Sequence, residues 1–188
     1  MTKGTTLQAR PCYNMGMHES LTRLIRDVPD FPKPGIIFKD ITPLLADPAG
    51  LSLAVELMAN PWRDHRPDLV IGAESRGFIF GTAVAQSLSC GFVPVRKPGK
   101  LPSETKSVSY ELEYGSDELQ IHADAIRPGQ KILLVDDLIA TGGTAKAASE
   151  LVEMLGGELL GLTVLIELVE LKGRNLLSDT VVQSLIQY

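Results

Sequence analysis

The sequence is poor in cysteine and histidine. Its 188 residues include two cysteines, Cys12 and Cys90, and three histidines, all far apart in the chain. Zinc and redox-active sites need these residues at short, regular spacings, and disulfide-stabilised domains need more cysteines. The scarcity therefore argues against a Cys/His metal site and a disulfide scaffold, and it favours a reducing compartment.

Long hydrophobic runs and excess positive charge are also missing. No apolar run approaches the roughly 18 residues of a membrane span, and the first twenty residues contain no stretch of the signal-peptide type. Lys and Arg number 18 against 23 Asp and Glu, a net charge of −5. A broad electrostatic grip on nucleic acid is not expected, so any anion must be bound by a local cluster. We expect a cytoplasmic protein that binds neither membranes nor nucleic acid.

The composition is that of an ordinary globular chain, with 44% hydrophobic and 22% charged residues. Its length suits one domain with a full core. Residues 1–16 are polar and show no periodicity, so we expect a disordered extension followed by a single domain over residues 17–188.

Short apolar runs alternate with helical patterns along most of the chain. We expect a helix through Leu21–Val28 that stops at Pro29, a helix starting at Asp47-Pro48, and further helices near 78–89 and 144–155. Strands are expected at Leu69–Ala73, Phe92–Arg96, Lys131–Asp136, Leu159–Leu168 and Val181–Ile186. Non-alternating strands separated by helices predict an α/β fold with an open, mostly parallel sheet flanked by helices.

One region departs from this pattern. Ser107–Tyr114 and Leu119–His122 alternate between polar and apolar residues, as an antiparallel hairpin with a solvated face does. The preceding segment, RKPGKLPSETK, is rich in Lys, Pro, Gly and Ser. We therefore expect a mobile loop and hairpin between the second and third strands of the sheet.

The strongest chemical signal is ILLVDDLIATGGT, Ile132 to Thr144. An apolar strand ends in two carboxylates, and a loop of small residues then opens directly into a helix. Ligands of open α/β sheets bind at the carboxyl ends of strands, and the N-terminus of a helix favours an anion. The motif therefore predicts a phosphate site, although it lacks the spacing of a Walker loop. The site is formed by Ala140, Thr141, Gly142, Gly143 and Thr144.

The two acids before this loop, Asp136 and Asp137, are adjacent, so their side chains point in different directions. This suits two vicinal hydroxyl groups, and a phosphate loop beside a diol-binding pair describes a ribose 5-phosphate. The alternative is an acidic strand end and a glycine-rich helix start that bind nothing. The thirteen-residue combination favours the sugar phosphate.

Two further segments carry candidate anion ligands. The sequence ESRG, Glu74 to Gly77, follows a strand and precedes a helix, so Arg76 can serve as a fixed cation in a second anion-binding turn. A structural ion pair between Arg76 and Glu74 is the alternative, and the sequence leaves the two about even. The segment after the next strand places Arg96, Lys97 and Lys100 within five residues, either as a diphosphate-binding cluster or as a solvated basic loop.

VDDLIATGGT resembles the phosphoribosyl diphosphate signature of the type I phosphoribosyltransferase family. Other segments resemble the branch of that family that acts on adenine, and they occur in the family's order from Pro29 to the C-terminus. These segments are PDFPKPGIIFKDITPLL (Pro29–Leu45), GAESRGFIFG (Gly72–Gly81), RKPGKLP (Arg96–Pro102), YELEYG (Tyr110–Gly115) and ELVELKGR (Glu167–Arg174).

The resemblance implies the family fold, with a small N-terminal hood (about residues 17–45) and an antiparallel flexible-loop hairpin (about residues 97–122). It implies that the ESRG turn grips pyrophosphate and that the basic segment binds the diphosphate, often across a dimer interface. Pro98 stands where some relatives carry a further basic residue, so one diphosphate contact is absent. The implied phosphoribosyl diphosphate ligands are Glu74, Ser75, Arg76, Arg96, Lys97, Lys100, Asp136, Asp137, Ala140, Thr141, Gly142, Gly143 and Thr144.

The base site implied by the resemblance lies in PKPGIIFKD. Phe38 would stack on one face of a purine and Ile139 would cover the other, while backbone groups of Ile37 and Lys39 would bind the amine edge of adenine. Phe38 as an ordinary core residue is the alternative. Lys39 replaces an Arg found in some relatives, which keeps the charge but loses the planar fork.

The resemblance also implies a catalytic role for Glu113, which with Tyr114 lies on the hairpin of the mobile loop. Glu113 would fold over the base on closure and exchange a proton with N7 of adenine, and Arg76 would stabilise the leaving group. An exposed glutamate with no role beyond solvation is the alternative.

The function implied is purine salvage: adenine and 5-phosphoribosyl 1-diphosphate give AMP and pyrophosphate. The Mg²⁺ cofactor would be carried by the substrate diphosphate, with no direct protein ligand, and the protein would be a homodimer. Two alternatives remain. The first is a phosphoribosyltransferase for guanine, hypoxanthine or xanthine. The second is a regulator that senses phosphoribosyl diphosphate, although such regulators add a basic DNA-binding domain for which this chain has neither length nor charge.

Overall fold

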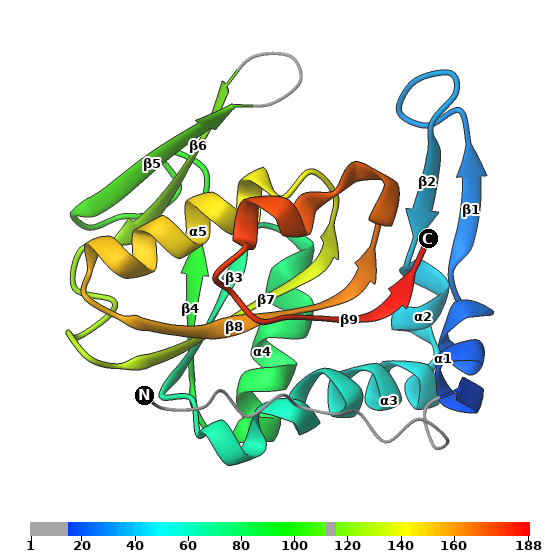
Figure 1. Ribbon diagram of the computed structural model, residues 1–188, viewed down its shortest axis with the longest axis horizontal. Helices are drawn as coiled ribbons and strands as arrows, with labels where there is room; N and C mark the ends of the chain where they lie inside the picture. Colours follow the sequence, from blue (N-terminus) through cyan, green and yellow to red (C-terminus); the bar gives the residue numbers. More distant parts are fainter. Residues whose placement is uncertain (1–14, 112–115) are drawn as a thin grey trace. The chain divides into compact units, whose positions relative to one another are not determined.

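The computed structural model describes residues 15–111 and 116–188 (Figure 1). The chain divides into two compact units, with the boundary in the sequence between Leu53 and Ala54, and each is described by itself. The proposed hood lies within the first unit, and the proposed flexible loop lies within the second. None of the described helices is long and apolar enough to cross a bilayer.

The first unit contains a two-stranded hairpin between short helices. Helix α1 (Met15–Thr22) precedes β1 (Arg26–Pro29), and β2 (Ile37–Asp40) precedes α2 (Thr42–Ala46) and the start of α3 (Pro48–Ala59). Strands β1 and β2 are antiparallel, with Val28 opposite Phe38. Asp47 caps α3 as expected, because its Oδ1 accepts a hydrogen bond from the N–H of Gly50 at 2.6 Å.

The expected helix through Val28 is wrong at its C-terminal end, because α1 stops at Thr22. Ile25 and Val28 are β-branched and fit a strand as well as a helix. The next residues pair with β2, and Arg26 donates a 2.5 Å hydrogen bond to Asp40 across the hairpin. The pairing with β2 therefore makes this segment a strand, and the local sequence pattern does not show that pairing.

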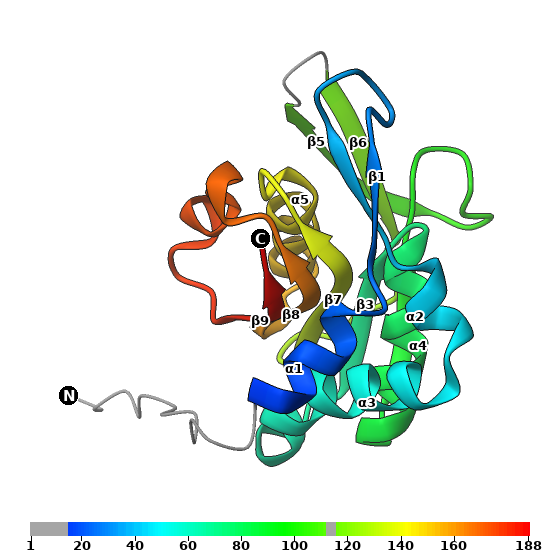
Figure 2. The same ribbon diagram turned by 90° about the vertical axis from the view of Figure 1, so that its right-hand side faces the viewer.

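The second unit is built on a five-stranded parallel sheet in the order β4-β3-β7-β8-β9. Helices α4 (Arg76–Leu88) and α5 (Gly143–Met154) cover its two faces (Figure 2). A 3-10 helix, η1 (Asn60–His65), leads into the sheet. The strands are β3 (Leu69–Ala73), β4 (Gly91–Val95), β7 (Lys131–Ile139), β8 (Glu158–Glu167) and β9 (Val182–Gln187).

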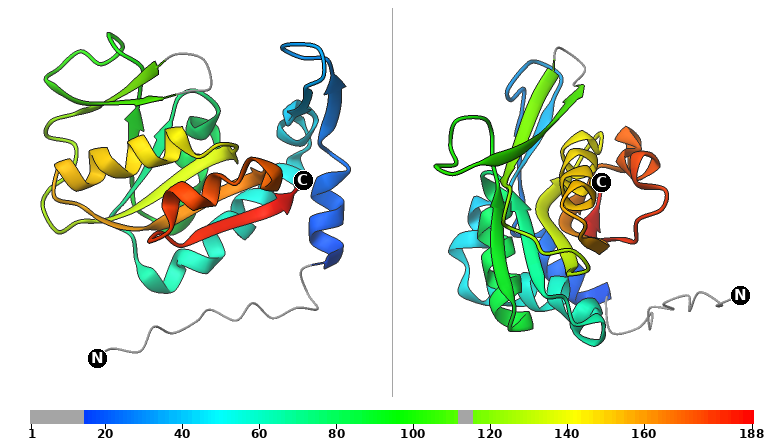
Figure 3. Two further views of the ribbon diagram at one scale, coloured as in Figure 1. Left: turned by 45° about the horizontal axis from the view of Figure 1, so that its top comes forward. Right: turned by 90° about the vertical axis from the view of Figure 1, so that its left-hand side faces the viewer.

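The observed strands and helices confirm the expected α/β class. Strand β7 is longer than expected and ends at Ile139, because its last residues pair with the end of β8. Both acids of the chemical motif therefore lie within the strand. Two 3-10 helices, η2 (Val169–Leu171) and η3 (Gly173–Leu177), join β8 to β9 and are seen in two further views (Figure 3).

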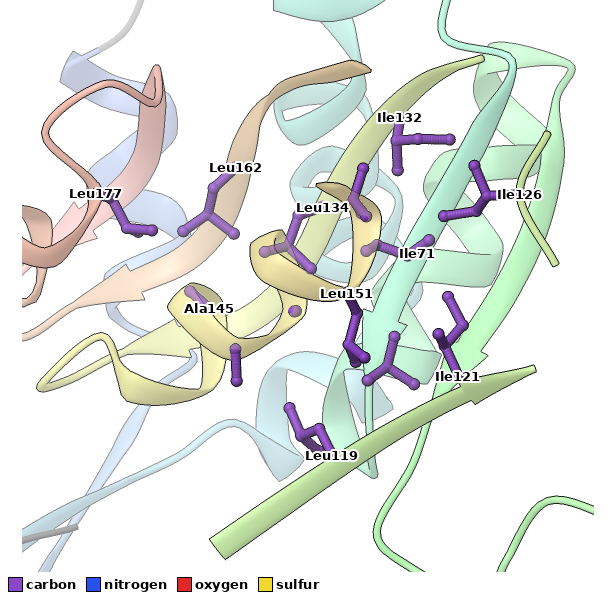
Figure 4. Packing of buried hydrophobic residues seen from close by; sticks show 14 of the residues in the cluster. Ile71, Leu119, Ile121, Ile126, Ile132, Leu134, Ala145, Leu151, Leu162 and Leu177 are labelled. Atoms are coloured by element: carbon purple, nitrogen blue, oxygen red, sulfur yellow. The ribbon is translucent and has the colours of Figure 1, made fainter. Parts of the chain in front are cut away.

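The predicted hairpin is present as β5 (Thr105–Glu111) and β6 (Ser116–His122). Its apolar side chains Leu119 and Ile121 are buried in the same cluster as Leu151 of α5 (Figure 4). Strand β6 also forms a bridge to Arg96 after β4. The hairpin is thus attached to the helix that begins at the predicted phosphate loop.

Candidate functional site

A cavity of about 240 Å³ opens at the carboxyl ends of β3 and β7. It combines the β3–α4 turn, the end of β7 and the loop into α5, which are the segments singled out from the sequence. Its lining consists of Glu74, Ser75, Arg76, Asp136, Asp137, Leu138, Ile139, Ala140, Thr141, Gly142, Gly143, Thr144, Ala145, Leu162 and Val164.

The loop between β7 and α5 has the geometry expected of an anion site. Gly142 has a φ of +88° and precedes the first residue of α5, a backbone conformation that favours glycine. The N–H of Lys146 is bonded to the carbonyl of Gly142, and the N–H groups of the preceding first turn have no acceptor within the helix. These donors, the helix dipole and the hydroxyls of Thr141 and Thr144 suit a phosphate group.

The side chains of Asp136 and Asp137 lie on opposite faces of β7, because they are adjacent in a strand. Asp137 is buried, with 6% of its surface exposed, whereas Asp136 is intermediate and its carboxyl faces the β3–α4 turn. Oδ1 of Asp136 accepts a hydrogen bond from the N–H of Asp137 at 2.9 Å. Burial and the repulsion of Asp137 raise the pKa of Asp136 well above its usual value. Burial also raises the pKa of Asp137, although Arg76 opposes this.

The ESRG turn packs against these acids. Nε of Arg76 lies 2.9 Å from Oδ2 of Asp137, and that oxygen is buried and accepts no hydrogen bond from the described residues. The contact is therefore an ion pair without hydrogen-bond geometry. A Cβ on Gly77 would lie 2.8 Å from Oδ1 of Asp136, so a side chain there would displace the Asp136 carboxyl. The peptide bond between Glu74 and Ser75 is cis.

Arg76 thus pairs with Asp137, and the alternative partner, Glu74, binds the basic segment. Glu74 accepts hydrogen bonds from Nε of Arg96 at 2.9 Å and from Nζ of Lys100 at 2.7 Å. Burial acts to raise the pKa of Glu74, but Lys100 and Arg96 outweigh it and lower the pKa. The third cation, Lys97, lies 2.8 Å from Asp117 of β6.

The charge of the predicted diphosphate cluster is therefore partly compensated. Glu74 is shared by Arg96 and Lys100, and Asp117 pairs with Lys97, so two carboxylates face three cations. The sequence could not indicate this, since the partners lie about twenty residues or more away along the chain.

The residues expected to bind adenine from the first unit lie on β2. Phe38 is half-buried and makes an edge-to-face contact with Phe31, with ring centroids 5.2 Å apart. Ile37 exposes 55% of its surface, and Lys39 lies 2.8 Å from Asp27 across the hairpin. Ile139 belongs to the second unit, so its expected sandwich with Phe38 stays a prediction.

Ile139 offers little surface to a base, because it is 3% exposed and belongs to the buried cluster. Its neighbour Leu138 is half-buried and lines the cavity, and the sequence analysis did not identify it. Side chains two residues apart on a strand share a face, so the spacing of Leu138 from Asp136 is the signal that could have indicated it. Tyr110 was also missed: its hydroxyl lies 3.4 Å from Oγ1 of Thr144. Glu113 and its neighbour Tyr114 lie outside the described residues.

The chain is similar in sequence to known proteins of one family. Residues 41–187 match the family model "Phosphoribosyl transferase domain". The chain is 56% identical over 171 residues to an adenine phosphoribosyltransferase of Rhodopirellula baltica, a match that covers 91% of this chain and 83% of that protein.

Solved structures of the same family are similar in fold. The crystal structure of adenine phosphoribosyltransferase from Rhodothermus marinus has a TM-score of 0.89 and 51% identity, covering 93% of this chain and all of that one. The enzyme from Saccharomyces cerevisiae, complexed with an imino-altritol bisphosphate and adenine, has a TM-score of 0.86 and 41% identity, covering 90% of this chain and 98% of that one. From its sequence and its fold, the chain belongs to the adenine phosphoribosyltransferase family.

Proposed function

We propose that this protein transfers the 5-phosphoribosyl group from 5-phosphoribosyl 1-diphosphate to adenine, giving AMP and pyrophosphate. The observation that carries the proposal is that Asp136 and Asp137 line the same cavity as the loop and first turn of α5, whose N–H groups suit a phosphate. The relatives share this activity by name, and the yeast enzyme was crystallised with adenine.

The polar groups that line this cavity match the phosphate and the hydroxyl groups of a ribose 5-phosphate. Thr141, Thr144 and the N–H groups at the start of α5 bind the 5-phosphate, and Asp136 and Asp137 accept hydrogen bonds from the two ribose hydroxyls. The volume of about 240 Å³ suits a sugar phosphate, since pockets for whole drug-sized ligands measure roughly 300–1,000 Å³. The base and the diphosphate then extend beyond the sugar.

The reaction is displacement at the anomeric carbon through an oxocarbenium-like transition state. Arg76, at the start of α4, stabilises the leaving pyrophosphate. Arg96 and Lys100 reach the diphosphate by exchanging Glu74 for phosphate oxygens, and Lys97 by leaving Asp117. Positioning and electrostatics supply most of the rate enhancement.

Mg²⁺ fits the acidic pair through water rather than as a protein-caged ion. The described residues contain no cluster of three or more acidic, Cys or His ligands. Oδ2 of Asp137 is buried beside Arg76 and accepts no hydrogen bond from them, so it would accept one from a metal-bound water once Arg76 turns toward the diphosphate. When bound, the ion would neutralise negative charge on the diphosphate.

For the base, we propose that the backbone groups of Ile37 and Lys39 bind the amine edge of adenine, with Phe38 against one face. Glu113 handles the proton at N7, and Tyr114 accompanies it on the loop. A homodimer and a cytoplasmic location complete the proposal.

A panel of bases tests the function. The protein is incubated with Mg²⁺ and phosphoribosyl diphosphate, and adenine, guanine, hypoxanthine or xanthine is added separately before the nucleotides are quantified by chromatography. We expect AMP from adenine and no product from the other bases. IMP, GMP or XMP would keep the sugar site but overturn the base assignment. No nucleotide from any base, with phosphoribosyl diphosphate bound, would favour a sensing regulator.

Replacing Glu113 by Gln tests its catalytic role. The amide cannot take a proton from N7, so we expect kcat to fall by at least about 100-fold while the Kd for phosphoribosyl diphosphate changes little. Single-turnover and binding measurements separate the two quantities. Unchanged turnover would remove Glu113 from the mechanism.

A further inference from the structure

The segment that follows β8 lies directly against the phosphate loop. A Cβ built on Gly173 would clash with the carbonyl oxygen of Ala140 and would lie 3.0 Å from the backbone nitrogen of Gly142. In the other direction, a Cβ on Gly142 would clash with the carbonyl oxygen of Gly173. The two backbones therefore touch with no room for a side chain. The views in Figures 1 and 3 show η2 and η3 beside the loop that leads into α5.

This segment is held by an ion pair that no step of the proposed reaction uses. Arg174, next to Gly173, forms a two-point contact with Glu167: its Nε bonds Oε1 at 2.5 Å and its Nη2 bonds Oε2 at 2.6 Å. Glu167 is the last residue of β8 and only 5% of its surface is exposed. A planar guanidinium on a buried carboxylate is a strong and orientation-specific contact.

Further hydrogen bonds fix the guanidinium in its plane. Nη1 of Arg174 bonds the carbonyl oxygen of Val182 at 2.7 Å, and Nη2 bonds the hydroxyl of Ser184 at 2.9 Å. Ser184 in turn donates to Oε2 of Glu167 at 2.6 Å. Arg174 is thus tied to both β8 and β9, the two strands that flank its segment.

The segment is anchored at both ends. The N–H of Leu168 bonds the carbonyl of Ile139, the last residue of β7, at 3.0 Å. Leu177, at the end of η3, is 4% exposed and belongs to the same buried cluster as Ala145 of α5 (Figure 4). Between these anchors, Gly173 is pressed against the loop, so a shift of Arg174 is transmitted to the loop backbone.

We propose that Glu167 and Arg174 are positioning residues for the 5-phosphate, acting through Gly173, which sets the backbone of the Ala140–Thr144 loop. The inference rests on the proposed function. Because the loop binds phosphate through backbone N–H groups, its donors must be held within a few tenths of an ångström of their bonding positions. The backing segment supplies that constraint from outside the cavity.

This role differs from a general contribution to stability, because it is selective between ligands. The 5-phosphate loop touches Gly173, whereas the ESRG turn, the proposed pyrophosphate site, packs on Asp136. Loss of the backing segment should therefore weaken binding of a sugar phosphate and spare pyrophosphate. A merely structural residue would weaken both or neither.

The test uses the variants Gly173→Ala and Arg174→Lys in the full chain. The first introduces the clash with Ala140, and the second keeps the charge but loses the planar fork. Isothermal titration with ribose 5-phosphate and, separately, with pyrophosphate gives the two dissociation constants. We expect the Kd for ribose 5-phosphate to rise about tenfold in both variants, and the Kd for pyrophosphate to stay within about twofold.

The matched control is Gly161→Ala. A Cβ at Gly161 in β8 would also clash, but with the side chain of Trp62 and, at 2.6 Å, with the carbonyl oxygen of Val181, away from the loop. We expect this variant to lower Tm while leaving both dissociation constants unchanged. Far-ultraviolet circular dichroism reports whether each variant is folded, because the clash at Gly161 would itself alter the fluorescence of Trp62, the single tryptophan of the sequence. If Gly173→Ala does not fold, Arg174→Lys decides the question.

Kinetics give a second readout. In both variants the KM for phosphoribosyl diphosphate should rise about tenfold, while the KM for adenine stays constant. Equal losses for ribose 5-phosphate and pyrophosphate, or no change in either, would overturn the positioning role. A wild-type protein that binds no ribose 5-phosphate would instead refute the proposed function, so the two failures are distinguishable.

Discussion

Asp136 and Asp137, the proposed ribose ligands, have a direct effect on the free energy of unfolding. Two adjacent carboxylates lie at a buried strand end, and burial raises the pKa of both, with mutual repulsion adding to the effect at Asp136. A carboxyl whose pKa is higher in the folded than in the unfolded chain destabilises the fold once the pH exceeds the unfolded pKa. In the ligand-free protein the pair therefore opposes folding at neutral pH.

Replacing Asp136 by Asn should stabilise the ligand-free protein. The amide keeps an oxygen to accept the N–H of Asp137 but carries no charge, so we expect a gain of roughly 1 kcal/mol and a rise in Tm of about 2–4 °C at pH 7.5. The gain should shrink as the pH is lowered toward about 4, where the wild-type carboxyl is protonated. Calorimetry over this range checks the sign. A lower Tm at neutral pH would contradict the account, and turnover should fall in either case.

At the proposed phosphate loop, Ala140–Thr144, we expect a single hydroxyl group to favour ligand binding. Thr141 is exposed at the cavity and precedes the left-handed Gly142. Replacing Thr141 by Ala removes one phosphate donor, so we expect the KM for phosphoribosyl diphosphate to rise about tenfold, as the loss of a charge-assisted hydrogen bond predicts. The KM for adenine serves as the internal control. An unchanged KM for phosphoribosyl diphosphate would contradict the phosphate assignment.

At the scale of elements, the segment after β4 and the turn after β3 form one electrostatic unit. Glu74 holds Arg96 and Lys100 in the ligand-free state. Replacing Glu74 by Gln should free both cations, so we expect pyrophosphate to bind about threefold to tenfold tighter at low salt, with the gain largely lost at about 1 M salt.

Glu104→Gln is the control for this change, because it removes the same charge from an exposed residue of the same region. It should leave the pyrophosphate affinity within about twofold, as expected for a screened surface charge. Titration calorimetry at two salt concentrations gives both comparisons. A weaker affinity in Glu74→Gln would show that Glu74 itself supports the diphosphate site.

Local patterns predicted most elements of the sheet, because buried strands and capped helices are determined by their own residues. Leu69–Ala73 is a strand over its full expected range, and Asp47 caps its helix. The sequence-based predictions were wrong where pairing with a distant strand determines the secondary structure. The region after Thr22 becomes a strand because β2 lies beside it, and β7 continues past Asp136 because β8 extends with it.

The candidate site divides in the same way. Asp136, Asp137 and the loop to Thr144 are contiguous, so one motif predicts their shared cavity. The pairing of Lys97 with Asp117, and the contact of Gly173 with Ala140, join segments far apart in the chain. Such contacts depend on the folded topology and leave no trace in local spacing.

At the scale of the whole molecule, a ligand that binds only the native cavity must stabilise the fold. Ribose 5-phosphate at 100 times its Kd should add about 2.7 kcal/mol, which for a chain of this size raises Tm by about 5–11 °C. Ribose at the same concentration lacks the phosphate and should raise Tm by less than about 1 °C. Thermal scans followed by Trp62 fluorescence measure both. Equal Tm shifts for the two sugars would argue against a cavity that binds the phosphate group.

The affinity of AMP compared with that of adenosine tests the central claim most directly, namely that the loop after β7 binds the 5-phosphate of the nucleotide. The two ligands differ only in that phosphate. With at least two charge-assisted hydrogen bonds to the loop, AMP should bind at least about 100-fold tighter than adenosine in the same calorimetric titration. Equal dissociation constants would contradict the assignment of Ala140–Thr144 as the phosphate site.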